Sequence, residues 1–287
     1  MTYPLWQWRN GVLTCELLSM WPHGFFTRLH TPQLPEVLHH HFWNGDSPSV
    51  TPNAEFSASH KHPKVVRAKQ VHGKRIIVHA NHQPHHHETT LPQTNPPVGN
   101  SPTNSPTNLP EADGVWLAGS QAYHSAWVCS ADCVPVLLGD VRLGHVAAVH
   151  AGWRGTAAGI VTEAVQLFTN QGSDLADLRV ALGPAISGQC YQVDQTVADQ
   201  VLATVRHSVG VTADPEPNRA RLDIRQVQRQ QLQELGLTEE QIAIAPHCTF
   251  TDGDKFFSYR RYCLATPPEN RGKSAVQWSG IGINHGK

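Results

Sequence analysis

Two apolar runs of strand length stand out in the middle of the chain, at residues 133–140 and 145–151. Residues 141–144 separate them and form a short loop, with aspartate and glycine at its mouth. This pattern predicts a β-hairpin or a pair of adjacent strands. In such a pair Cys133 begins one strand and His150 ends the other, so we expect their side chains to converge at the same end of a sheet.

Shorter apolar runs, bounded by glycine, proline or polar clusters, predict the other strands and several helices. The apolar spacing predicts a helix over residues 156–170, with Thr156 as its N-cap, and Gly236 is a stop signal for a later helix. The elements alternate without a regular βα rhythm, which favours mixed sheets with flanking helices over a doubly wound fold. Further strands are expected just before Arg28 and at residues 65–71, 75–79, 115–118, 126–129, 178–182 and 242–245, and further helices at 196–207 and 224–235.

Residues 80–110 differ in composition from the rest of the chain. They are rich in His, Pro, Asn, Ser and Thr, and Asn-Ser-Pro-Thr occurs at 100–103 and again at 104–107. Such a segment has few side chains to bury, so we expect a disordered, low-complexity insertion or a long surface loop. The histidine tract at 39–41 is interpreted as a solvated loop, because consecutive side chains cannot all face one ion. The tract at 85–87 can bind stray metal, but we place no site there.

Length and charge narrow the class of protein. A chain of 287 residues with 39% hydrophobic composition can bury a sizeable core, as one large domain or two small ones. Its net charge of −1 and its pI of about 7.0 disfavour nucleic acid and membrane surfaces as partners. The N-terminus lacks the pattern of an export signal, so we expect a soluble cytoplasmic protein whose six cysteines are reduced thiols or metal ligands.

Three candidate metal ligands stand at the ends of predicted strands: His72, Cys133 and His150. Two imidazoles and a thiolate suit Zn²⁺, and three protein ligands leave a fourth position open, as in catalytic zinc sites. Cys129 lies four residues before Cys133, on the same face of an extended strand, and competes as a ligand. Two alternatives stay open. Cys133 is an ordinary buried thiol beside core histidines, or it is a nucleophile activated by one of the histidines.

An anion site is expected beside these ligands. The helix predicted from Thr156 begins directly behind Arg154, so its free backbone N–H groups and its dipole favour a phosphate there. Three further arginines are candidates for the same anion: Arg28, Arg260 and Arg261. A solvated surface position is the alternative for Arg28.

Several blocks of the chain then resemble, in order, the motifs of the YfiH-like laccase-domain family, the purine nucleoside phosphorylases once called polyphenol oxidases. The resemblance runs from Val65 to Arg261, and the block with His-Ala-Gly-Trp-Arg-Gly is the most specific part of it. The blocks are Gln-Val-His-Gly (70–73), Ala-Asp-Cys-Val-Pro-Val-Leu (131–137), Val-His-Ala-Gly-Trp-Arg-Gly (149–155), Leu-Gly-Pro-Ala-Ile (182–186), Cys-Thr (248–249) and Phe-Ser-Tyr-Arg-Arg (257–261).

The resemblance implies a single α+β domain of layered mixed β-sheets flanked by helices, spanning residues 1–287. It places His72, Cys133 and His150 at the positions of the family's metal ligands, with zinc as the expected metal and copper as the alternative. It also implies phosphorolysis of adenosine, inosine and 5′-methylthioadenosine to base and ribose-1-phosphate, together with adenosine deamination. Purine nucleosides and phosphate are the partners it implies.

The chain departs from known patterns at two positions of interest. Gly73 and Lys74 follow His72, so the H-x-E signature of nucleobase zinc deaminases is absent, and we assign the proton shuttle to Asp132. After Arg28 the chain continues with Leu-His-Thr-Pro, where the family usually has a glycine pair and a serine.

Three other functions remain as alternatives. A copper-dependent polyphenol oxidase of the multicopper type needs paired H-x-H segments, which only residues 60–62 and 85–87 approach. A cysteine hydrolase would use Cys133 as its nucleophile. A binding module would hold a metal or a nucleoside without turning it over.

Overall fold

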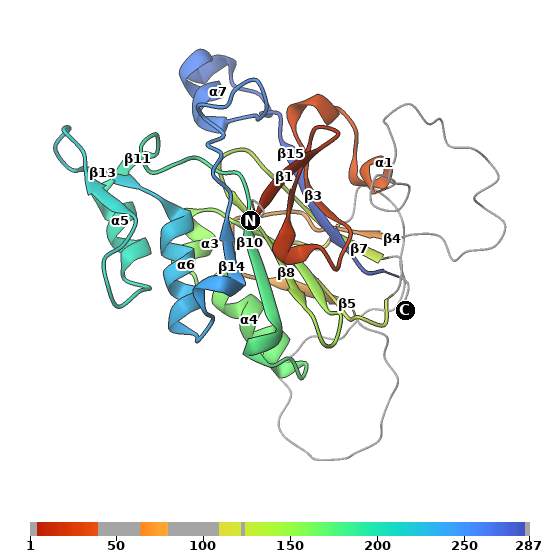
Figure 1. Ribbon diagram of the computed structural model, residues 1–287. Helices are drawn as coiled ribbons and strands as arrows, with labels where there is room; N and C mark the ends of the chain where they lie inside the picture. Colours follow the sequence, from red (N-terminus) through yellow and green to blue (C-terminus); the bar gives the residue numbers. More distant parts are fainter. Residues whose placement is uncertain (1–4, 40–63, 80–108, 122–123, 285–287) are drawn as a thin grey trace.

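The computed structural model of the protein describes residues 5–39, 64–79, 109–121 and 124–284 (Figure 1). Residues 80–108 of the predicted insertion lie outside these ranges. The same holds for the H-x-H segment at 60–62 and for the histidine tracts at 40–41 and 85–87.

The two apolar runs form neighbouring strands of a six-stranded mixed sheet, here called the central sheet. Its strands are β5 (Ile76–His79), β6 (Gly114–Leu117), β8 (Val134–Asp140), β9 (Val146–Ala151), β10 (Leu178–Leu182) and β14 (Ile242–Ile244). They lie in the order β14-β10-β8-β9-β6-β5. Strands β8 and β9 are antiparallel, with Pro135 opposite His150, which confirms the predicted strand pair.

A second six-stranded sheet packs on one face of the central sheet. In order, its strands are β1 (Trp6–Arg9), β2 (Val12–Cys15), β3 (His23–Phe25), β15 (Gln277–Gly282), β7 (His124–Ser130) and β4 (Lys64–Val66). Phe25 and Ile281 of this sheet lie in one buried cluster with Leu137 and Ala148 of the central sheet. The two sheets therefore form a sandwich.

Helices cover the opposite face of the central sheet. Val136 and Val149 point into a second buried cluster, where they meet Ile160 and Phe168 from a helix. Strands β8 and β9 are thus buried on both faces, which is why they form unbroken apolar runs in the sequence. The helices on this side are α3 (Trp153–Ala157), α4 (Ile160–Asn170), α5 (Gln195–Leu202) and α6 (Ile224–Glu234).

A small antiparallel sheet completes the described part of the chain. It consists of β11 (Gln192–Asp194), β12 (Val211–Ala213) and β13 (Arg219–Leu222), and in Figure 1 it lies beside α5 and α6. Two further helices, α1 (Pro35–Leu38) and α7 (Tyr259–Ala265), lie outside these layers. Layered mixed sheets with flanking helices confirm the predicted α+β class. Within the described ranges, no helix has the length and apolar character that crossing a bilayer requires.

The helix predicted over residues 156–170 is in fact two helices, so the predicted start of the helix is wrong. Helix α3 begins at Trp153, and Thr156 lies inside it with its hydroxyl donating to the Gly152 carbonyl at 2.9 Å. Gly159 then adopts φ +79°, a left-handed conformation that glycine reaches without strain, and α4 begins after it. Arg154 therefore lies within a five-residue helix, and no long helix begins behind it.

Helix α7 was not expected from the sequence. Its N-cap is Ser258, whose side chain accepts a hydrogen bond from the backbone N–H of Arg261. Only seven residues form this helix, and none of them is buried. An apolar pattern could not reveal it, because a helix with no buried face has no apolar stripe.

Candidate metal centre

His72, Cys133 and His150 come together at one end of the central sheet. Their potential ligand atoms all lie within 4.8 Å of one another, and the two imidazole rings are nearly perpendicular, with centroids 4.9 Å apart. Cys133 immediately precedes β8, His150 lies in β9, and His72 lies in the loop between β4 and β5. This confirms the predicted convergence of Cys133 and His150. His150 is buried and His72 is exposed, so the cluster opens toward solvent on the His72 side.

A buried carboxylate, that of Asp113, holds both histidines. Its oxygens accept hydrogen bonds from the backbone N–H groups of Val71, His72 and Gly73 at 3.2, 2.9 and 2.7 Å. The same carboxylate lies 3.0 Å from Nδ1 of His150. The loop needs this anchor because His72 has φ +61°, which is rare for a residue with a side chain.

Asp113 is the site residue that the sequence interpretation missed. Ligand histidines commonly donate their second ring N–H to a carboxylate, which fixes the ring and its tautomer. Here that contact directs Nε2 of His150 away from Asp113. The available signal was an Asp-Gly pair at the start of a fully buried strand, where a charged residue requires partners. Burial alone would raise the pKa of Asp113, but hydrogen bonds from His150, Gly73 and His72 lower it below its usual value.

The pKa values of Cys133 and His150 are both shifted from their usual values. Burial opposes ionisation of Cys133, yet hydrogen bonds from His150 and His72 lower the pKa of its thiol to about 7. Burial likewise disfavours the charged form of His150, but hydrogen bonds to Asp113 and Cys133 raise the pKa of this imidazole to about 9. The metal-free protein therefore holds a thiolate beside an imidazolium near pH 8.

Gly152 is required by the packing of this site. A Cβ atom at this position would lie 2.7 Å from Sγ of Cys133 and 3.6 Å from Cδ2 of His72. The first distance is shorter than real Cβ contacts allow. The glycine in the His-Ala-Gly-Trp-Arg-Gly block thus leaves room for the ligands.

The four predicted anion-binding arginines lie in different surroundings. Arg154 is exposed and lies over the ring of Trp153 at 4.2 Å. Arg260 is half-buried, donates to the Gln192 carbonyl and lies 5.3 Å from the Tyr191 ring centroid.

The other two arginines bind backbone carbonyls. Arg28 is exposed, donates to the Gly253 carbonyl and lies over the ring of Phe257 at 5.1 Å. The guanidinium of Arg261 donates to the carbonyls of Thr249, Phe250 and Phe256. Arg261 therefore connects these loops to α7.

The chain has relatives among known proteins. A family model for the multi-copper polyphenol oxidoreductase laccase matches residues 23–275. The chain belongs to this laccase family. It is 41% identical to the purine nucleoside phosphorylase slr1573 of Synechocystis sp., over 96% of this chain and 97% of the relative. It is also 35% identical to the adenosine deaminase RL5 of an unknown prokaryotic organism, over 47% of this chain and 52% of the relative.

A solved structure shares the fold. The crystal structure of YlmD from Geobacillus stearothermophilus superposes with a TM-score of 0.72 at 25% identity, covering 98% of this chain and 99% of that one. The comparison supports one domain for the chain, as the resemblance implied.

Cys129, the competing ligand, lies apart from the metal centre of this family member. Within the described ranges, the cluster of potential ligands contains only His72, Cys133 and His150. The backbone N–H and carbonyl of Cys129 each bond to the side-chain amide of Gln70 at 2.8 Å. Burial raises the pKa of the Cys129 thiol to about 11, so it is a poor thiolate ligand.

Asp132, the predicted proton shuttle, precedes the candidate metal ligand Cys133 and has φ +86°. Its Oδ1 accepts a hydrogen bond from the Thr249 hydroxyl at 2.6 Å. Its Oδ2 accepts bonds from the Ser258 hydroxyl at 3.0 Å and from the Arg260 backbone N–H at 2.7 Å. The carboxylate thus ties the cysteine loop to the start of α7.

Proposed function

We propose that this protein is a zinc-dependent purine nucleoside phosphorylase that also deaminates adenosine. Adenosine, inosine and 5′-methylthioadenosine are the proposed nucleosides, which react with phosphate to give the base and ribose-1-phosphate. One observation carries the proposal: two imidazoles and a thiol converge at an open sheet end, in a chain 41% identical to a purine nucleoside phosphorylase.

The donor set fits zinc. Three nitrogen and sulfur ligands with an open side are the usual protein contribution to a catalytic zinc site. The lowered pKa of Cys133, to about 7, favours the thiolate that a metal requires, and Asp113 orients His150. His72, Cys133 and His150 would hold a zinc ion, which would supply Lewis-acid chemistry in this site.

Phosphate binding is assigned to arginines beside the metal centre. Arg154 follows the ligand His150 by four residues, and Arg260 is tied through its backbone to Asp132, next to the ligand Cys133. Arg260 also lies over the ring of Tyr191. Arg154 and Arg260 would hold the phosphate dianion by charge-assisted hydrogen bonds and orient it toward the sugar carbon.

Arg28 and Arg261 are proposed in supporting roles. Their guanidinium groups bind backbone carbonyls of the loops at 249–257. These contacts position α7, which begins beside Asp132.

Asp132 remains the proposed proton shuttle for deamination. Its neighbours Thr249 and Ser258 donate to it, so a proton accepted by the carboxylate would pass along hydroxyl groups. The similarity to an adenosine deaminase over half of that protein supports this second activity.

A copper site is the first alternative for the metal, because the family description names copper. Imidazole and thiolate ligands suit copper as well as zinc. Elemental analysis of purified protein separates the two metals. Copper at one equivalent, with oxygen consumed in the presence of a phenol, would overturn the zinc proposal.

A metal-free cysteine enzyme is the second candidate, and one contact chain favours it. Cys133 hydrogen-bonds to His150, which in turn contacts Asp113, the order of nucleophile, base and orienting carboxylate. Zinc-free protein that retains turnover, and loses it on substrate-protected alkylation of Cys133, would support this candidate.

The deciding experiment is product analysis of zinc-loaded protein incubated with adenosine, with and without phosphate. We expect adenine only with phosphate and inosine without it. Cys133→Ala should lose both products together with zinc, whereas the matched variant Cys129→Ala should keep all three. No product from zinc-loaded protein would overturn the proposed function.

A further inference from the structure

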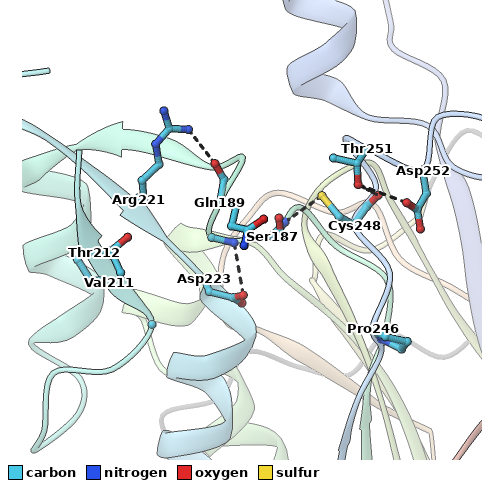
Figure 2. A pocket seen from close by; sticks show the side chains of 12 residues that line it. Ser187, Gln189, Val211, Thr212, Arg221, Asp223, Pro246, Cys248, Thr251 and Asp252 are labelled. Carbon is cyan, nitrogen blue, oxygen red and sulfur yellow. Dashed lines mark hydrogen bonds between the residues drawn. The ribbon is translucent and has the colours of Figure 1, made fainter. Parts of the chain in front are cut away.

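Outside the metal centre, a second pair of cysteines lies beside a pocket. The pocket has a volume of about 540 Å³, and Cys248 and Ser187 are among the residues that line it. In Figure 2 these two residues face each other across the junction of two segments. None of the metal ligands His72, Cys133 and His150 is among the lining residues.

A tight turn brings Cys190 to the same place. The backbone N–H of Cys190 donates to the Ser187 carbonyl at 2.9 Å, so the chain folds back over Ser187. The backbone N–H of Ser187 donates to Sγ of Cys248 at 3.3 Å. Ser187 therefore bonds to Cys190 through its carbonyl and to Cys248 through its backbone N–H, which brings the two cysteines together around one residue.

The surroundings of the two thiols differ. Burial would raise the pKa of Cys248, but hydrogen bonds from Ser187 and Thr251 lower it below its usual value. Burial and the neighbouring Cys248 raise the pKa of Cys190. Cys248 is thus the better nucleophile, and it lines a pocket that a small molecule can enter.

We propose that Cys190 and Cys248 form a reversible disulfide by exchange with a small-molecule disulfide such as oxidised glutathione. The Cys248 thiolate attacks one sulfur of glutathione disulfide, and the first glutathione leaves as a thiolate that takes a proton from water. Cys190 then loses its proton to solvent and attacks the Cys248 sulfur, which releases the second glutathione. Two cysteine thiols are oxidised and one disulfide is reduced to two thiols.

The cross-link would join two segments that hold the metal loop. Ile186, in the Cys190 segment, donates its backbone N–H to the Asp132 carbonyl at 3.1 Å. Thr249, next to Cys248, donates its hydroxyl to the Asp132 carboxylate. A disulfide here would therefore restrain both segments that bond to Asp132, the residue before Cys133.

Peptide mapping by mass spectrometry tests this proposal on the zinc-loaded full chain. After incubation with oxidised glutathione we expect a Cys190–Cys248 cross-linked peptide, two hydrogen masses lighter than the thiol pair, that a dithiol reducing agent reverses. It should form more than about tenfold faster than any disulfide at Cys15 or Cys129. Burial raises the pKa of these two thiols to about 12 and about 11.

Matched variants sharpen the result. Cys190→Ser should stop at a glutathione adduct on Cys248, whereas Cys263→Ser should still form the cross-link. The proposal is overturned if both cysteines of the wild-type chain stay reduced, or if each carries its own glutathione adduct without a cross-link. Neither result depends on the proposed enzymatic activity.

Discussion

The two ends of the β8–β9 pair use the same device for different purposes. At one end the fully buried Asp113 accepts backbone N–H bonds from the loop at 71–73. At the other end the fully buried Asp140 accepts backbone N–H bonds from Arg142 and Leu143 at 2.7 and 2.8 Å. Each carboxylate satisfies the donors of a tight loop.

The difference lies in the remaining contacts of the carboxylates. In the part of the chain that the structure describes, Oδ2 of Asp140 has no hydrogen-bond partner, whereas both oxygens of Asp113 are bonded and one also contacts Nδ1 of His150. A loop anchor thus becomes part of the candidate metal centre when it also orients an imidazole. Comparing the two ends separates what supports the fold from what supports the metal.

Replacing the two aspartates should give the largest difference in zinc affinity between the two ends. Asp113→Asn turns an amide toward donors and weakens the hold on His150, so zinc affinity should fall by about 10-fold to 100-fold. Asp140→Asn should leave zinc affinity unchanged. Both should lose about 1 to 3 kcal/mol of unfolding free energy, because each disturbs buried hydrogen bonds. Chelator competition and urea unfolding measure the two quantities, and equal zinc affinity in both variants would contradict this role of Asp113.

Two glycines provide the next comparison. Gly152→Ala places a methyl group against Sγ of Cys133 and should lower zinc affinity by about tenfold. Gly144→Ala, at the other end, only strains a residue with φ +71° and should cost about 1 kcal/mol of stability. The same zinc titration measures both variants. Unchanged zinc binding by folded Gly152→Ala would mean that the cysteine loop yields to the methyl group.

Two arginines test the anion site. Arg154→Ala should raise the KM for phosphate by about tenfold, because one charge-assisted hydrogen bond to the dianion is lost. Arg142→Ala should not change this KM, since Arg142 pairs with Asp174 and Asp177 at the opposite end of the strands. Initial rates at varied phosphate concentration give both values. A KM that moves equally in both variants would indicate general electrostatics instead of a specific contact.

The smallest of the predicted effects is the release of protons when zinc binds. At pH 8, Cys133 with a pKa of about 7 is already a thiolate, and His150 with a pKa of about 9 still carries its proton. Zinc needs both groups deprotonated, so binding at pH 8 should release about one proton from these two residues, and at pH 6 about two. Zinc affinity should therefore rise with pH up to about 9. Calorimetry in buffers of different ionisation enthalpy measures the protons released.

His145, the residue before β9, is an internal reference for the pKa of His150. Burial lowers the pKa of His145, whereas contacts with Asp113 and Cys133 raise that of His150. In NMR titrations of metal-free protein, His145 should lose its proton below pH 6.5 and His150 near pH 9. A His150 resonance that titrates below His145 would contradict the assigned contacts.

Much of the site was accessible from the sequence because it lies on one strand pair. Cys133 and His150 begin and end two apolar runs joined by four residues, and an antiparallel pair with a short turn must bring such ends together. The helix boundary at Gly159 and the helix α7 were not accessible in this way. Helix α3 is too short to show an apolar period, and α7 buries no face.

The sequence by itself therefore determined the strand pair, the α+β class and the three candidate ligands, since periodicity and turn length are local properties. Only the tertiary structure decided that His72 joins the other two ligands, that Asp113 holds both histidines, and that Cys190 meets Cys248. These contacts join segments that are distant along the chain. Their closeness depends on how sheets and loops pack, and a pattern along one segment carries no information about the segment packed against it.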